Sequence, residues 1–175
     1  MAKPLEAAAL ALTTDRSGPI DAAQLRRAFG RFPTGVAAVC GLESGEPVGM
    51  AVSSFTSVSL DPALVLLCVA RASRTWARLA QLGSLGLSIL GEGDEEVVRS
   101  LASGGAHRFA GIDWEARPSG AVLVRNAAAW FECEHYDQVR GGDHDVVLLE
   151  IRALTVFPEI APLVFHASHF TRLAD

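Results

Sequence analysis

Apolar segments of strand length, separated by turns and a few helix signals, run along most of this chain. Residues 63–70 (ALVLLCVA) are apolar throughout, which is typical of a strand buried on both faces. Further strands are expected at 36–42, 48–54, 85–90, 127–136, 145–157 and 162–170. Turn residues at 43–47 (ESGEP) predict that the first two of these strands form a hairpin.

Three segments carry helix signals. Residues 21–30 begin with Asp21 as a candidate N-cap and end at a glycine. Ser73 is a candidate N-cap for a second helix over about 74–82, and acidic residues open a third helix over 93–103. Many short strands with helices at their connections predict a mainly β fold, either a barrel or a sandwich, with helical caps.

Composition and charge exclude several classes of protein. The 175 residues are 50% hydrophobic and 20% charged, which suits one compact domain with a substantial core. The net charge of −5, without any run of Lys or Arg, argues against a nucleic-acid partner. The longest apolar run, 63–70, is far too short to span a membrane. We therefore expect a cytoplasmic protein with a flexible tail over 1–20, one domain over 21–175, and no membrane or nucleic-acid partner.

The cysteines and histidines show no spacing typical of metal ligands. Cys40, Cys68 and Cys133 each lie in an apolar, strand-like segment, so we interpret them as buried, reduced core residues. His166 and His169 are close in sequence, but the period of a strand would place them on opposite faces. The sequence therefore predicts no metal site.

The segment 49–62 (GMAVSSFTSVSLDP) is strand-like and carries five hydroxyl side chains. Residues 71–75 (RASRT) then lead into the second expected helix. Backbone amides and short hydroxyls at a helix start can hold a phosphate group, with Arg71 or Arg74 adding charge. The alternative is that Ser73 merely caps the helix, and spacing alone favours it, because serine is among the commonest N-caps.

Several apolar residues near these motifs have a simpler interpretation than ligand contact. Within the hydroxyl-rich segment, Met50, Phe55 and Val58 are interpreted as core residues. Trp114 and Trp130 are large and mainly apolar, and we assign both to the core as well.

Six blocks of the sequence carry a further signal through their order and separation. They are FPTGVAAV (32–39), VGMAVSSFTSVSLDPALVLLCVARASRTW (48–76), HRFAGIDW (107–114), AWFECEHY (129–136), GGDHDVVLLEI (141–151) and PLVFHASHF (162–170). Together they resemble the flavin reductase-like, FMN-binding split-barrel family, in particular the reductase components of two-component flavin-dependent monooxygenases. The resemblance runs from about Leu25 to the C-terminus and implies an FMN-binding split β-barrel.

The resemblance implies a flavin-binding role for residues of several blocks. Positions 51–54 would run along the edge of the isoalloxazine ring, and Ser57 and Ser59 would lie near the ribityl chain or support the strand. Positions 71–75 would take the phosphate, and 108–109 would close over the flavin. The complete set of expected flavin-binding residues is Pro33, Thr34, Ala51, Val52, Ser53, Ser54, Ser57, Ser59, Arg71, Ser73, Thr75, Arg108 and Phe109.

The same resemblance implies where the nicotinamide nucleotide binds. His144, in a Gly-Asp-His turn, is the candidate catalytic residue that meets the nucleotide. His166 and Phe170, in the segment FHASHF, are the remaining cofactor-binding candidates. Asp143 is interpreted as a turn-forming residue beside Gly142.

The activity that the resemblance implies is hydride transfer from NADH (or NADPH) to FMN or FAD. The reduced flavin would leave for a partner oxygenase, and the flavin would carry the redox chemistry. A homodimer is also implied, because in this family the flavin lies at a subunit interface.

Two alternatives follow from the same residues. The segment HASHF lacks an arginine that the family commonly has there, which motivates a tight flavin-binding protein, a sensor or carrier without efficient reductase turnover. Oxidation of pyridoxal phosphate on the related split barrel is a third possibility, which the six blocks do not support.

Overall fold

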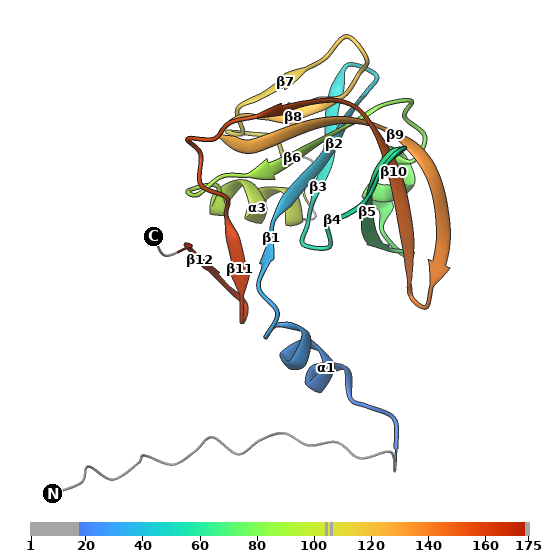
Figure 1. Cartoon of the computed structure of the whole chain (residues 1–175), viewed down its shortest axis with the longest axis vertical. Coiled ribbons are helices and arrows are strands. Elements are labelled where there is room, and N and C mark those ends of the chain that lie inside the picture. Colours follow the sequence, from blue (N-terminus) through green and yellow to red (C-terminus); the bar gives the residue numbers. More distant parts are fainter. Residues whose placement is uncertain (1–17, 104, 106, 174–175) are drawn as a thin grey trace, which may run out of the picture.

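The computed structural model describes residues 18–103, 105 and 107–173, and most of the expected N-terminal tail lies outside them. The described residues are mainly β, with a few short helices at the connections (Figure 1). The helices are α1 (Ala22–Phe29), α2 (Arg74–Leu79) and α3 (Glu95–Ala102). The strands are β1 (Thr34–Gly35), β2 (Ala37–Glu43), β3 (Glu46–Val52), β4 (Thr56–Leu60), β5 (Ala63–Ala70), β6 (Leu85–Leu90), β7 (Trp114–Ala116), β8 (Val122–Val124), β9 (Ala127–Gly141), β10 (His144–Val156), β11 (Val164–His166) and β12 (His169–Thr171).

The main sheet has seven strands in the order β3-β2-β6-β9-β10-β5-β4 and curls into a split barrel. Its two edge strands, β3 and β4, are consecutive in the chain and are joined by residues 53–55. In that link the Ser54 hydroxyl accepts a hydrogen bond from the Cys68 amide at 2.8 Å and donates one to the Cys68 carbonyl at 3.0 Å. Ser54 therefore extends the pairing of β4 with β5 through its side chain, at the point where the chain passes from one edge of the sheet to the other. The mainly β fold with helical caps is confirmed.

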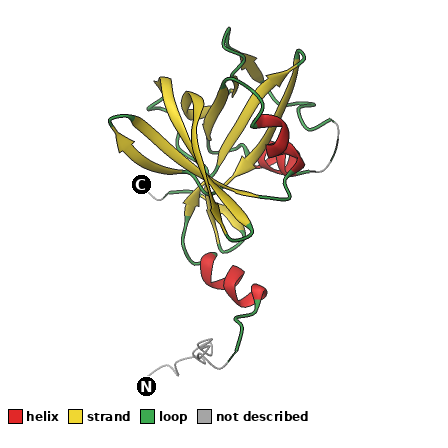
Figure 2. Cartoon of the chain, turned by 90° about the vertical axis from the view of Figure 1, so that its right-hand side faces the viewer, coloured by secondary structure: helices red, strands yellow, loops and turns green. Residues whose placement is uncertain are grey.

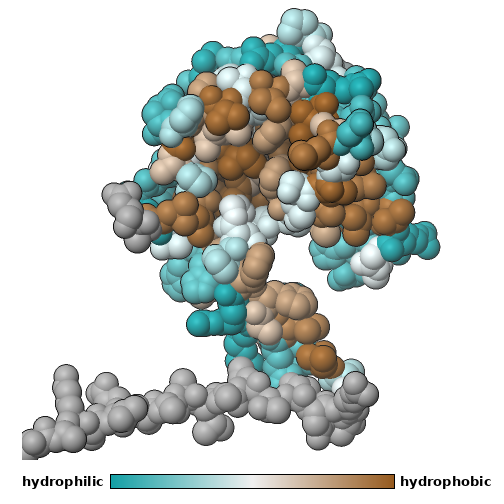
Figure 3. All heavy atoms as spheres, in the orientation of Figure 1, coloured by the Kyte–Doolittle hydropathy of each residue, from teal (hydrophilic) through white to brown (hydrophobic). Residues whose placement is uncertain are grey.

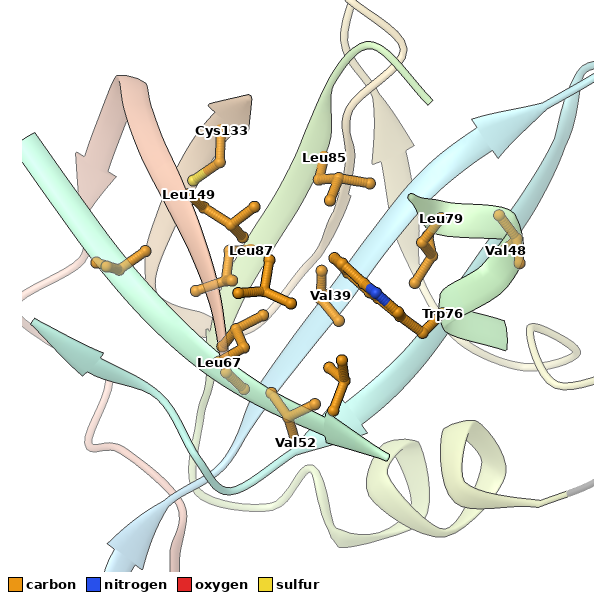
Figure 4. Packing of buried hydrophobic residues seen from close by; sticks show 14 residues of the cluster. Val39, Val48, Val52, Leu67, Trp76, Leu79, Leu85, Leu87, Cys133 and Leu149 are labelled. Atoms are coloured by element: carbon orange, nitrogen blue, oxygen red, sulfur yellow. The ribbon is translucent and has the colours of Figure 1, made fainter. Parts of the chain in front are cut away.

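Buried side chains cover both faces of the main sheet. Leucines of the inner face pack with Trp76 of α2, which closes one end of the barrel (Figure 4). Val39 of β2 points into this inner cluster, whereas its neighbour Cys40 joins an outer cluster with Leu101 of α3 and Val122 of β8. Because β2 is covered on both faces, it needs no polar alternation, and this explains the continuous apolar pattern of its sequence.

Local signals in the sequence correctly predict the start or the turn of several elements. Asp21 accepts a hydrogen bond from the Gln24 amide at 3.3 Å, and Ser73 accepts one from the Trp76 amide at 3.1 Å, so both N-caps are confirmed. The turn between β2 and β3 lies at Ser44 and Gly45, whose φ angles of 52° and 87° are the left-handed values that such a tight hairpin turn requires. Met50 and Phe55 pack against the inner cluster as expected.

The C-terminal segment differs from its prediction. Residues 162–170 do not form one strand, because Ala167 and Ser168 adopt φ angles of 49° and 66° and turn the chain between β11 and β12. His166 and His169 are consequently direct cross-strand partners instead of lying on opposite faces of one strand. No glycine, proline or asparagine marks this turn, so no local pattern predicts it.

The hydroxyl-rich segment also differs from a single strand. β3 ends at Val52 and β4 begins at Thr56, so 49–62 contributes to two strands at opposite edges of the sheet. Val58, interpreted above as a core residue, is 46% exposed. The pairing of β4 with β5 shifts register between Ser57 and Ser59, and this bulge turns Val58 outward.

Candidate functional site

A cleft of about 790 Å³ opens on one side of the barrel, between β3, α2 and the segment that precedes β7. Its lining includes residues 47–49 of β3, Arg74, Thr75 and Arg78 of α2, and Arg108, Phe109 and Trp114. Three of the residues expected at the site from the sequence, Thr75, Arg108 and Phe109, are thus brought together, although they come from two separate segments of the chain.

Arg108 joins the three walls of the cleft. Its Nη1 donates to the Thr75 hydroxyl at 2.7 Å and to the Gly49 carbonyl at 3.4 Å. The Gly49 carbonyl is accessible because, among the strands that the structure describes, β3 pairs only with β2 and leaves its other edge unpaired. The cleft therefore presents a hydroxyl and a guanidinium group, donors suited to an anionic ligand, beside the unpaired edge of β3.

Aromatic side chains form the apolar side of the cleft. Phe109 and Trp114 make an edge-to-face pair with ring centroids 6.3 Å apart. An added Cβ at position 49 would overlap Cys40 Sγ and would also stand 3.0 Å from the Phe109 ring, so Gly49 lets the strand pass close to both side chains. Trp114, interpreted above as a core residue, is only partly buried and lines the cleft.

The residues of the expected phosphate-binding segment, 71–75, do not all line the cleft. The Ser73 hydroxyl caps α2 through the Trp76 amide and also lies 3.9 Å from the Met50 sulfur. The capping interpretation is thus confirmed, and it leaves Thr75 as the hydroxyl of this segment that lines the cleft. Arg71 points elsewhere, because its Nε lies 4.0 Å from Asp145 Oδ1.

His144 lies at the start of β10, beside this arginine. Its Nδ1 is 2.8 Å from Asp143 Oδ1, and this hydrogen bond holds the pKa of the Asp143 carboxyl below its ordinary value. Asp143 also accepts the Arg71 amide through its backbone carbonyl. The turn-forming aspartate therefore has a second structural role, which is to orient the imidazole ring of His144.

The remaining hydroxyl-segment residues differ in what they can offer to a ligand. Val52 is 7% exposed and points into the core, so only its backbone is available. Ser54 is hydrogen-bonded to Cys68, and the Ser59 hydroxyl accepts the Asp61 amide at 3.3 Å. Ala51 is partly buried, and Ser53 and Ser57 are exposed. Contact of these residues with a flavin stays a prediction.

Four further residues of the expected site lie in, or directly before, a different sheet, which is formed by β1, β11 and β12. They are Pro33, Thr34, His166 and Phe170, and none of them lines the cleft. The ring of Phe170 packs 5.4 Å from that of Phe165 and beneath the guanidinium group of Arg99. Within a single chain the structure therefore separates these four residues from the expected residues that line the cleft.

Sequence reasoning missed two residues of the cleft, Arg78 and Trp114. Arg78 follows Arg74 by four residues on α2, so both side chains project from the same face of the helix. This i,i+4 spacing was readable from the sequence. Trp114 was not, because nothing local distinguishes a cleft-lining aromatic residue from one in the core.

The cysteines and acidic residues give no sign of other chemistry. Burial raises the pKa of Cys40 and Cys133 to about 12, so both thiols stay protonated and serve as core residues. Cys68 is partly buried. Within the described ranges, no group of three or more His, Cys, Asp or Glu side chains is placed to hold a metal ion. None of the helices that the structure describes is long and apolar enough to cross a bilayer.

Comparison with known proteins places this geometry in a family. Residues 29–174 match the model of the flavin reductase like domain. The chain is 39% identical over 134 residues to the stachydrine N-demethylase reductase subunit Stc3 of Rhizobium meliloti, a match that covers 76% of this chain and 58% of that protein. The chain thus spans somewhat more than half the length of this relative.

Two further proteins are similar over more of their length. The reductase subunit HsaB of a flavin-dependent monooxygenase from Rhodococcus jostii is 34% identical over 152 residues, which is 87% of this chain and 78% of that protein. The structure of the NADH:FAD oxidoreductase SgcE6 of Streptomyces globisporus, in complex with NAD and FAD fragments, superposes with a TM-score of 0.86. That match has 39% identity and covers 94% of this chain and 98% of the other.

Proposed function

The chain belongs to the flavin reductase like domain family, and on this basis we propose that it transfers hydride from NADH to a flavin and supplies reduced flavin to a partner oxygenase. The observation that carries the proposal is the likeness, over nearly the whole chain, to an NADH:FAD oxidoreductase. An oxygenase partner is supported by relatives that are reductase subunits of a monooxygenase and a demethylase.

The cleft fits the flavin that this activity needs. The Thr75 hydroxyl and the Arg108 guanidinium group, held 2.7 Å apart, are suited to bind its phosphate. The unpaired edge of β3, around positions 49–53, offers backbone hydrogen bonds to a polar ring edge. When bound, the flavin supplies the capacity to accept a hydride, so the protein needs no strong acid or base of its own. The side chains of the cleft have to bind and orient the two reactants.

Exposed apolar residues support the proposal of a homodimer. α1 has no buried side chain and lies outside the barrel in both views (Figures 1 and 2). Phe29 at its end is 69% exposed, and Phe32 just after it is 73% exposed. Apolar residues also gather over the face of the barrel that is turned toward the viewer (Figure 3). A second copy covering these surfaces would also account for the division of the expected site, because Pro33, Thr34, His166 and Phe170 could face the cleft of the partner.

A direct assay separates a reductase from a tight flavin-binding protein. A reductase that releases its product needs only moderate flavin affinity, around micromolar, or about −8 kcal/mol. Neutral hydrogen bonds from β3 to the flavin, at a net ~1 kcal/mol each, are consistent with an affinity of this size. We expect the purified protein to be pale or colourless and to oxidise NADH over many turnovers once FMN or FAD is added. Protein that stays yellow through dialysis and does not turn over would favour the binding-protein alternative.

Replacing His144 by alanine is expected to lower the efficiency with which NADH is used and to leave flavin affinity unchanged. The ring is held by Asp143 at the start of β10 and does not line the cleft, so its loss should leave flavin affinity nearly unchanged. We expect kcat/KM for NADH to fall by about tenfold, the equivalent of one lost hydrogen bond. Steady-state rates and flavin fluorescence titration measure the two effects. His135→Ala, on the exposed surface of β9, is the matched control. A collapse of flavin affinity with normal hydride transfer would remove the role assigned to His144.

A further inference from the structure

The wall of the cleft that carries Arg108 and Phe109 has little regular structure of its own. Both side chains come from residues 107–113, where backbone hydrogen bonds close turns between α3 and β7. The segment then enters β7, which pairs over three residues with β8 and with no other strand that the structure describes. A two-stranded pairing of this length is marginal by itself. The place of Arg108 and Phe109 therefore depends on what fixes β7.

Glu115, at the centre of β7, ties the two strands together at their ends. Its Oε1 lies 2.9 Å from Arg117 Nη1, and its Oε2 lies 2.9 Å from Arg125 Nη2. Arg117 is the first residue after β7, and Arg125 is the first residue after β8. The Glu115 side chain is only 23% exposed, and each of its oxygens has its own guanidinium partner. These contacts therefore form a network, which is worth more than an isolated surface pair.

The two arginines extend this network in opposite directions. Arg117 reaches β9 of the main sheet, where its guanidinium group lies 5.4 Å from the centroid of the Trp130 ring and its Nε lies 3.5 Å from Glu132 Oε1. Arg125 reaches the last residue before β7, Asp113. Its amide donates to the Asp113 carbonyl at 2.9 Å, and its Nε lies 3.3 Å from Asp113 Oδ1. The carboxylate at the centre of β7 thus links the main sheet to the wall of the cleft.

Small shifts of this wall would matter to a ligand. Arg108 donates to the Thr75 hydroxyl at 2.7 Å, and a displacement of about 1 Å would take the two groups out of hydrogen-bond distance. Trp114, which follows the segment 107–113, packs against the outer cluster, but apolar contacts are not directional. The ion pairs of Glu115 have a defined geometry, so they add the direction that the apolar contacts lack.

We propose that Glu115 is a positioning residue for flavin binding, which acts through Arg117 and Arg125. By fixing β7, it holds Arg108 where this residue and Thr75 can bind the flavin phosphate. Glu115 itself lies outside the lining of the cleft as the structure describes it. The inference rests on the proposed function, in which Thr75 and Arg108 bind that phosphate. It deepens the proposed function, because it makes the preference for a phosphorylated flavin depend on a network outside the cleft.

The test is Glu115→Gln in the full-length protein, since glutamine keeps the shape of glutamate and removes its charge. We expect the preference for FMN over riboflavin, measured as the ratio of their Kd values by fluorescence titration, to fall by about tenfold. A loss of stability alone would not change this ratio, because unfolded protein binds neither flavin.

Arg125→Met provides a second variant at a side chain that is 51% exposed, where a change is tolerated by the fold. It should lower the same ratio by a similar factor. The double variant with Glu115→Gln should lower the ratio no further than either single variant, because both substitutions break one network.

Glu134→Gln is the matched control, because Glu134 pairs with Arg152 at 3.0 Å on β9 and β10, outside the cleft. It should leave the ratio of the two Kd values unchanged. Hydrogen exchange gives a measurement without ligand. The amides of residues 107–113 should exchange faster in Glu115→Gln than in the wild type, and at the wild-type rate in the control.

A wild-type preference for FMN that Glu115→Gln and Arg125→Met both retain overturns the inference, and so does an equal loss in the control. Wild-type protein that binds FMN and riboflavin equally would overturn the inference together with the assignment of the phosphate to Thr75 and Arg108. Flavin titration needs no turnover. Protein that shows the expected ratios but does not oxidise NADH would therefore overturn the proposed function alone.

Discussion

Replacing Gly86 by alanine is expected to lower the free energy of unfolding by about 3 kcal/mol or more. Gly86 lies on β6, where β8 crosses it so closely that an added Cβ would overlap the carbonyl oxygen of Val122. The obstructing atoms belong to the backbone of a completely buried residue, so no flexible side chain can move aside. Chemical denaturation would show a lower midpoint with an unchanged slope.

The matched control for this substitution is Gly83→Ala. Gly83 precedes β6, has nothing within 4 Å of an added Cβ, and does not adopt a left-handed backbone conformation. Alanine there should be neutral or slightly stabilising, by up to about 1 kcal/mol, since it restricts the unfolded chain. Similar midpoints for the two variants would show that β8 does not approach β6 as closely as described.

Thr75→Val is expected to weaken FMN binding by about 10- to 150-fold while changing riboflavin binding little. Valine keeps the shape of threonine and removes the hydroxyl that lines the cleft beside Arg108. A charge-assisted hydrogen bond to a phosphate contributes roughly 1.5–3 kcal/mol. Riboflavin has no phosphate, so its binding does not depend on this hydrogen bond. Fluorescence titration with both flavins measures the difference.

Thr56→Val on the exposed strand β4 controls for the loss of a threonine hydroxyl, and it should leave both affinities unchanged. Thr75 is the better choice for this test than Ser73, because Ser73 caps α2 and its replacement would also destabilise the helix. An equal loss for FMN and riboflavin would place the phosphate outside this cleft.

The sequence by itself determined the elements whose signals are local. Asp21 and Ser73 were readable as N-caps because a cap bonds to an amide only three residues away. The β2–β3 turn was readable because Gly45 favours left-handed backbone angles. The resemblance carried by six blocks also gave the family, which the match over residues 29–174 confirms.

Only the tertiary structure decided the contacts that join distant segments. Arg108 is 33 residues from Thr75 and 59 from Gly49, and no local pattern predicts that its side chain spans both. Ser54 carries a hydroxyl of the kind that binds ligands, yet that hydroxyl makes hydrogen bonds with the Cys68 backbone of β5. The turn at Ala167 is set by strand pairing and not by turn residues. In each case, the packing of a curled sheet selects the partner of a side chain, and that choice depends on the whole chain at once.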